Sequence, residues 1–165
     1  MTKEQSSELC TSCGLCCYAF HNFGYVENQE EQQIIEKFGG IIFTNNKGKL
    51  CFKQPCPAFN GICSVYPNHP SSCQEYQCKL LKSMQNNNIT PDKAKKIVEN
   101  TRKEVMLIDN SLEILLGKRT VTVDHYIDLF LEKIEENSNL RNKYQKLLLN
   151  IGVYTYLRTK YFNFD

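Results

Sequence analysis

The residues of this chain best suited to chemistry are its cysteines. Nine occur among 165 residues, and eight of them stand in two groups. The first group is the run Cys10-Thr11-Ser12-Cys13-Gly14-Leu15-Cys16-Cys17, and the second consists of Cys56, Cys63, Cys73 and Cys78. Thiolates separated by two residues can enclose one soft metal ion, because the turn between them directs both sulfurs inward. The pattern predicts a metal-binding protein.

Two other interpretations of the cysteines explain the pattern less well. Free cysteine is often a buried apolar residue, but that accounts for one or two positions rather than eight in close groups. Disulfides need an oxidising compartment, and residues 1–8 contain no apolar segment of the kind that directs export. We therefore expect metal-bound thiolates in a cytoplasmic protein.

The doubled cysteine at the end of the first group is harder to fit onto one ion, since neighbouring side chains tend to diverge. Either Cys16 and Cys17 serve different metals, or only one of them is a ligand. If they serve two centres, the eight thiolates divide into two sets of four. Each set then mixes sulfurs from residues 10–17 with sulfurs from residues 56–78.

Charge and hydropathy exclude some partner classes. The net charge of +2 is too small to indicate nucleic-acid binding, and the basic residues of 79–119 are interspersed with acidic ones. No apolar stretch approaches the roughly 20 residues that a membrane-spanning helix needs. We expect metal ions and a protein partner of unknown identity, with neither a membrane nor a nucleic acid.

The composition divides the chain into two parts, because every cysteine lies in residues 10–78. We predict a cysteine-cluster metal-binding module over residues 1–82 and a helical region over residues 83–165, packed as one compact unit. The polar run at residues 83–88 is the expected linker. The predicted fold class is α-dominated with a small irregular or β part, in which the metal-binding module packs on a three- to four-helix bundle.

In the first part, Asn28 is placed to cap a short helix that ends at Gly39. Residues 40–44 and 49–52 flank an Asn-Asn-Lys-Gly turn and predict a β-hairpin. Beyond Pro55, turn residues recur every few positions, so we expect irregular backbone held by metal.

The second part carries clear helical signals. Thr90 followed by Pro91 predicts a helix start, and apolar residues continue at helical spacing to Ile108. A short helical piece is expected over residues 111–116, another helix over 122–134, and a last one from Ser138 to about Tyr154.

The order of the cysteines resembles the CxxCxxCC, or YkgJ-like, cysteine-cluster family. The resemblance rests on Cys-x2-Cys-Gly-x-Cys-Cys, on Cys56-Pro57, on the stretch from Gly61 to Pro67, and on Pro70-x2-Cys73-x2-Tyr76-x-Cys78. The family is described as a zinc- or iron-chelating domain without a settled activity. A similar cluster in flagellin lysine methylases is associated with iron–sulfur. The resemblance implies the following metal ligands: Cys10, Cys13, Cys16, Cys17, Cys56, Cys63, Cys73 and Cys78.

The chain departs from the family pattern at two positions. His69 stands where the family usually has arginine, which puts any role of that arginine in doubt, and Cys51 falls outside the pattern. We expect Cys51 to be a half-buried strand residue. His21 and His69 lie near the cysteines in sequence but are not needed beside eight sulfurs, and His125 belongs to a helix.

The spacing favours iron–sulfur over zinc. Structural zinc sites typically use two Cys-x2-Cys pairs, whereas the second group here is widely spaced. The run Cys10-x2-Cys13-x2-Cys16 instead matches the cysteines of bacterial ferredoxins, whose fourth ligand is followed by proline, as Cys56 is. We therefore expect a 4Fe–4S cluster, with zinc as the alternative.

Three functions are compatible with these features. The first is an iron–sulfur protein that supports electron transfer, or a redox or modification reaction on a partner. The second is a zinc-stapled interaction or structural module without catalysis. The third is an accessory to a protein lysine methylase-type reaction. The sequence contains no glycine-rich strand-to-helix turn for S-adenosylmethionine or a dinucleotide, so it gives the third no direct support. Whether the chain is an enzyme is left open.

Overall fold

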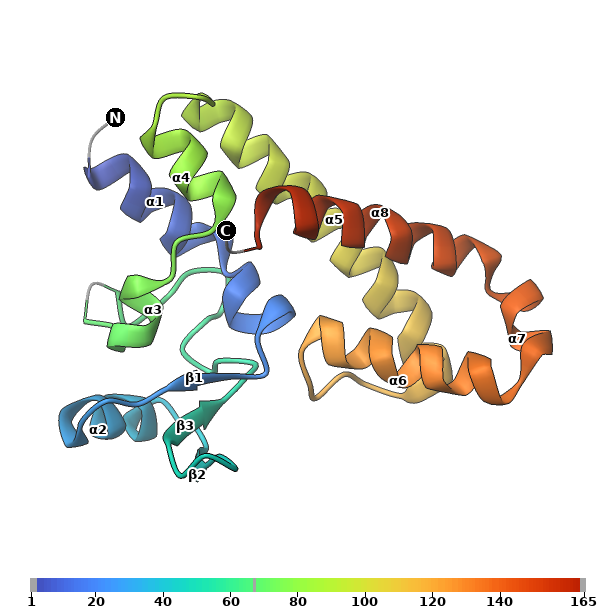
Figure 1. Cartoon of the computed structure of the whole chain (residues 1–165), viewed down its shortest axis with the longest axis horizontal. Coiled ribbons are helices and arrows are strands. Elements are labelled where there is room, and N and C mark those ends of the chain that lie inside the picture. Colours follow the sequence, from blue (N-terminus) through green and yellow to red (C-terminus); the bar gives the residue numbers. More distant parts are fainter. Residues whose placement is uncertain (1–2, 67, 164–165) are drawn as a thin grey trace.

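The protein is mostly helical, and its computed structural model describes residues 3–66 and 68–163. The first part contains α1 (Lys3–Cys13), the π-helical turn η1 (Cys16–Phe20), β1 (Phe23–Tyr25), α2 (Gln29–Lys37), β2 (Ile42–Thr44), β3 (Leu50–Lys53) and α3 (Ser71–Glu75). There follow α4 (Lys79–Gln85), α5 (Pro91–Leu116), α6 (Val123–Glu136), α7 (Ser138–Lys143) and α8 (Gln145–Tyr161). The expected α-dominated fold class with a small β part is confirmed (Figure 1).

The small sheet has the strand order β1-β3-β2, and both pairings are antiparallel. Strands β2 and β3 form the expected hairpin, whose turn is held by Asn45 Oδ1 accepting from the Lys47 and Lys49 N–H groups. The third strand, β1, was not expected. The sheet and α2 enclose a small core of Val26, Ile35 and Phe52.

Helix α2 begins where the sequence predicts. Asn28 Oδ1 accepts from Glu31 N–H at 2.9 Å, which satisfies one of the free donors of the first turn. The Glu31 carboxylate accepts in turn from Ser71 N–H at 2.9 Å and from the Ser71 hydroxyl at 2.5 Å. These bonds attach α3, which carries Cys73, to the sheet side of the molecule.

The helix boundaries differ from the sequence prediction at two places in the helical region. Residues 91–116 form one continuous helix rather than a helix and a separate short piece, and α5 ends at Gly117, whose φ is +81°. The expected last helix from Ser138 is divided at Tyr144 into α7 and α8. Asn137 caps α7, and α8 is the longer helix that packs against α5.

One large core joins the N-terminal segment to the helices. Leu9, Leu15, Ala19 and Phe20 lie in the same buried cluster as residues of α4, α5, α6 and α8. Figure 1 shows α1 beside α4, and it shows the end of α8 returning toward this corner of the molecule. The expected boundary at residues 82 and 83 falls within α4.

The end of α8 reaches back to the cysteine-bearing segments. Phe162, which follows α8, packs on Phe20 with ring centroids 5.2 Å apart. The Tyr76 hydroxyl donates to the Phe162 carbonyl at 2.7 Å. Residues separated by almost the whole chain therefore meet beside η1.

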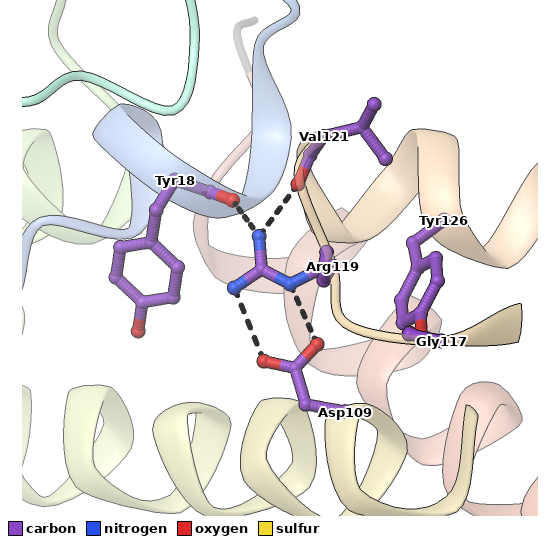
Figure 2. A network of polar contacts seen from close by, with 6 residues as sticks. All are labelled: Tyr18, Asp109, Gly117, Arg119, Val121 and Tyr126. Atoms are coloured by element: carbon purple, nitrogen blue, oxygen red, sulfur yellow. Dashed lines mark hydrogen bonds and ion pairs between the residues drawn. The ribbon is translucent and has the colours of Figure 1, made fainter. Parts of the chain in front are cut away.

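A polar network around Arg119 ties η1 to the helices (Figure 2). The guanidinium pairs with both carboxylate oxygens of Asp109, with Nε to Oδ1 at 2.7 Å. It also donates to the carbonyls of Tyr18 at 3.1 Å and Val121 at 2.7 Å. Nearby on α5, Arg102 donates to the Ser12 carbonyl at 3.2 Å. Two arginines thus hold the N-terminal segment at Ser12, within the first cysteine group, and at Tyr18, directly after it.

Within the described residues, no helix combines the length and apolar character that crossing a bilayer requires.

The Arg119 network predicts a difference between two cations that join the N-terminal segment to the helices. Arg119→Gln leaves Asp109 and the Tyr18 carbonyl without their partner, and we expect a loss of about 1–3 kcal/mol in the free energy of unfolding. The matched control is Lys95→Gln, which breaks the solvent-exposed pair with Glu8 and should change little. Urea unfolding measures both. Equal effects of the two variants would contradict the role given to Arg119.

Candidate metal centre

All eight cysteines of the two groups line one cavity of about 100 Å³. They come from α1, from η1, from the irregular segment before α3, from α3 itself and from the start of α4: Cys10, Cys13, Cys16, Cys17, Cys56, Cys63, Cys73 and Cys78. The ninth, Cys51, is not among the lining residues. It lies fully buried in β3, where its thiol donates to the Lys49 carbonyl at 3.5 Å. The fold therefore separates Cys51 from the others, as the cysteine pattern predicts.

The first group is positioned by the end of a helix rather than by an open loop. Cys10 and Cys13 are three residues apart in the last turns of α1, so they share one face. Gly14 then reverses the chain with φ of +64°, and its carbonyl accepts from Cys17 N–H at 2.7 Å. Cys16 and Cys17 follow on η1, with their sulfurs 3.8 Å apart.

The second group is attached to the first through the backbone. Cys56 N–H donates to the Cys17 carbonyl at 2.8 Å, and Cys63 N–H donates to the Thr11 carbonyl at 3.0 Å. Cys78 caps α4, where its sulfur accepts from Leu81 N–H at 3.5 Å. These contacts bring residues 56–78 against residues 10–17.

A close contact at Gly14 adds to this attachment. A Cβ built at Gly14 would lie 1.9 Å from Phe59 Cζ, so the aromatic ring occupies the space that any other side chain needs. The Phe59 ring stacks in turn on Tyr18, with centroids 5.6 Å apart. Glycine is required here both for its backbone conformation and for the approach of the ring.

Burial raises the pKa of several thiols that line the cavity. It raises the pKa of Cys10 and of Cys73 to about 12 in each case, and repulsion from neighbouring thiolates adds to the effect. Within the close pair, the hydrogen bond from Cys17 lowers the pKa of Cys16, while the same bond and burial raise the pKa of Cys17. Metals bind the thiolate form, so a bound cation would supply the charge that this cavity lacks.

All nine cysteines are free thiols, and the sulfurs of Cys16 and Cys17 are far beyond bonding distance. A metal site needs at least three histidine, cysteine, aspartate or glutamate side chains close together. Residues 3–66 and 68–163 contain no such group. The thiols surround a shared cavity but do not converge. A ligand there would have to draw the sulfurs together.

The rest of the cavity wall is largely apolar. Phe20, Phe52 and Phe162 contribute to it, together with the half-buried His69, which packs against Tyr66. His21 instead lines a neighbouring cavity that also reaches Cys16, Cys17 and Cys73, and its ring meets Tyr76 edge-on. Burial lowers the pKa of His21, and the nearby Arg158 lowers it further. His125 lies half-buried in α6, apart from both cavities.

Two lining residues were missed by the sequence analysis. Gln54 borders both cavities and is almost completely buried, and within the described part of the chain its Oε1 atom has no hydrogen-bond partner. Phe162 closes the wall from the far end of the chain. Gln54 stands two residues before Cys56 but belongs to no metal-binding motif, and Phe162 is far from every cysteine in the sequence.

The glycine contact predicts a specific effect of one methyl group. Gly14→Ala should destabilise the protein by more than about 1 kcal/mol and lower its metal content, because the Cβ displaces Phe59 in addition to straining the backbone. Gly61→Ala is the matched control, since Gly61 also has positive φ, +83°, but faces open space. Urea unfolding and metal analysis compare the two. A Gly14→Ala protein no less stable than Gly61→Ala would show that Phe59 does not depend on this glycine.

In comparisons with known proteins, no family model, no curated protein and no solved structure matches the chain. The site therefore has to be interpreted from its own residues.

Proposed function

We propose that this chain is a metal-binding protein whose cysteines hold an iron–sulfur cluster that supports electron transfer, or a redox or modification reaction on a protein partner. One observation carries the proposal: eight thiols from five segments line a single, largely apolar cavity, and the one cysteine outside the pattern is elsewhere. Eight partly buried thiols at one place are unusual for packing alone, since an apolar core needs no sulfur.

The donor set fits a soft metal. Thiolates select iron–sulfur clusters, zinc and copper(I) over hard cations, and the described cavity offers sulfur in preference to carboxylate. The Cys-x2-Cys-x2-Cys spacing favours iron–sulfur among these. A bound cluster would supply one-electron redox chemistry, and free thiols of this kind belong to a reducing compartment such as the cytosol, where we place the protein.

The chain's own residues have three tasks in this account. The cysteines bind, the aromatic side chains of Phe20, Phe52 and Phe162 exclude water, and Arg119 holds the η1 segment in place. Water exclusion matters because solvent exposure and hydrogen bonds to the sulfurs set the reduction potential of such clusters.

Zinc is the second candidate, and one observation favours it. Among the described residues, the core cluster on the sheet side has only Val26, Ile35 and Phe52 as buried members, so this part gains little from apolar burial. A structural zinc can contribute on the order of 10 kcal/mol to folding. Stapling the loops between the sheet and α4 would then be the whole task of the metal.

The test is the metal content of the protein purified without oxygen. Iron with acid-labile sulfide and a brown colour would support the iron–sulfur cluster. Zinc without iron would reverse the order of the two candidates, and less than one metal ion per chain would contradict both.

Variants in the same experiment separate ligands from other cysteines. Cys13→Ser and Cys73→Ser should each lose metal, because a serine oxygen is a poor substitute for thiolate at a soft ion. Cys51→Ser is the matched control and should keep its metal, since Cys51 lies outside the cavity. Equal metal loss from all three would remove the distinction between Cys51 and the proposed ligands.

A further inference from the structure

The eight thiols are not evenly distributed around the cavity. Cys10 and Cys13 lie on α1, and Cys78 lies at the start of α4, which packs against α1. All three thiols contact the large core formed by the helices. They therefore occupy the helical side of the cavity.

Other thiols occupy the sheet side. Cys56 and Cys73 pack against the small core of Val26, Ile35 and Phe52. Cys63 is brought toward Cys56 by Phe59, whose N–H donates to the Cys56 carbonyl and which forms an isolated antiparallel bridge with Cys63. Cys17 is held to the same side, because its carbonyl accepts from Cys56 N–H.

We infer that the cavity holds two four-thiolate metal centres, one bound by Cys10, Cys13, Cys16 and Cys78 and the other by Cys17, Cys56, Cys63 and Cys73. Cys16 belongs to the first set because it completes the Cys-x2-Cys-x2-Cys run and makes both sets four. The inference rests on the proposed metal-binding function and states how the ligands of that site are divided.

Each centre has the same construction. Three ligands come from one stretch of chain, and the fourth comes from the other: Cys78 closes the first set, and Cys17 closes the second. The two sets meet at the peptide bond between Cys16 and Cys17, whose sulfurs are 3.8 Å apart. The centres would therefore be neighbours, which suits the passage of an electron from one to the other, and together they would staple the N-terminal segment to residues 56–78.

The two closing cysteines give a decisive set of variants. Cys78→Ser and Cys17→Ser should each remove about half of the metal. The double variant across the sets, Cys17→Ser with Cys78→Ser, should remove nearly all of it. The double variant within one set, Cys17→Ser with Cys73→Ser, should lose no more than Cys17→Ser alone, because both changes disable the same centre.

The opposite pattern would overturn the division: a within-set double that loses twice as much as the single, or a single that loses everything. Metal-free wild-type protein would instead defeat the proposed function itself. Because a single variant can also lose metal by misfolding, the wild-type apoprotein provides a second test. Titrated anaerobically with zinc alone and followed by native mass spectrometry, it should take up two zinc ions per chain. A limit of one zinc, or of more than two, would contradict two separate four-thiolate centres.

Discussion

The burial of eight thiols around one cavity is the constraint on which the rest of the structure depends. A buried thiol ionises with difficulty, and each thiolate that forms makes the next one harder to form. Burial accordingly raises the pKa of Cys10 and of Cys73 to about 12 in each case. Metal binding would make thiolate formation favourable, because the cation supplies positive charge where water is excluded.

The segment from α1 to η1 connects the cavity to the rest of the molecule. It carries cysteines into the cavity and also places Leu9, Leu15 and Phe20 in the core of the helices. Arg102 and Arg119 bind it to the helical part at Ser12 and at Tyr18. The cysteine-bearing part and the helical part are therefore not independent bodies within the described residues, since they share one core and meet in one cavity wall.

Local signals predicted much of the fold. The caps at Asn28 and Thr90, the hairpin turn at Asn45 and the helix end at residue 116 all depend on neighbouring residues, and the structure has them where the sequence places them. The continuity of α5 through residues 109–111 and the break at Tyr144 were missed, because tertiary packing decides them. β1 is too short to carry a pattern of its own and exists through its pairing with β3. The grouping of eight cysteines around one cavity agrees with the cysteine pattern, whereas Phe162 and Gln54 join it through contacts that span the chain.

X-ray absorption at the metal edge, on protein purified without oxygen, tests the central claim most directly. If the cysteines hold the metal, the first shell should consist of about four sulfurs per metal ion, at about 2.3 Å where the metal is zinc. A first shell dominated by nitrogen or oxygen, at about 2.0–2.2 Å for zinc, would contradict the account, because the metal would then be bound by residues other than the eight cysteines of the cavity.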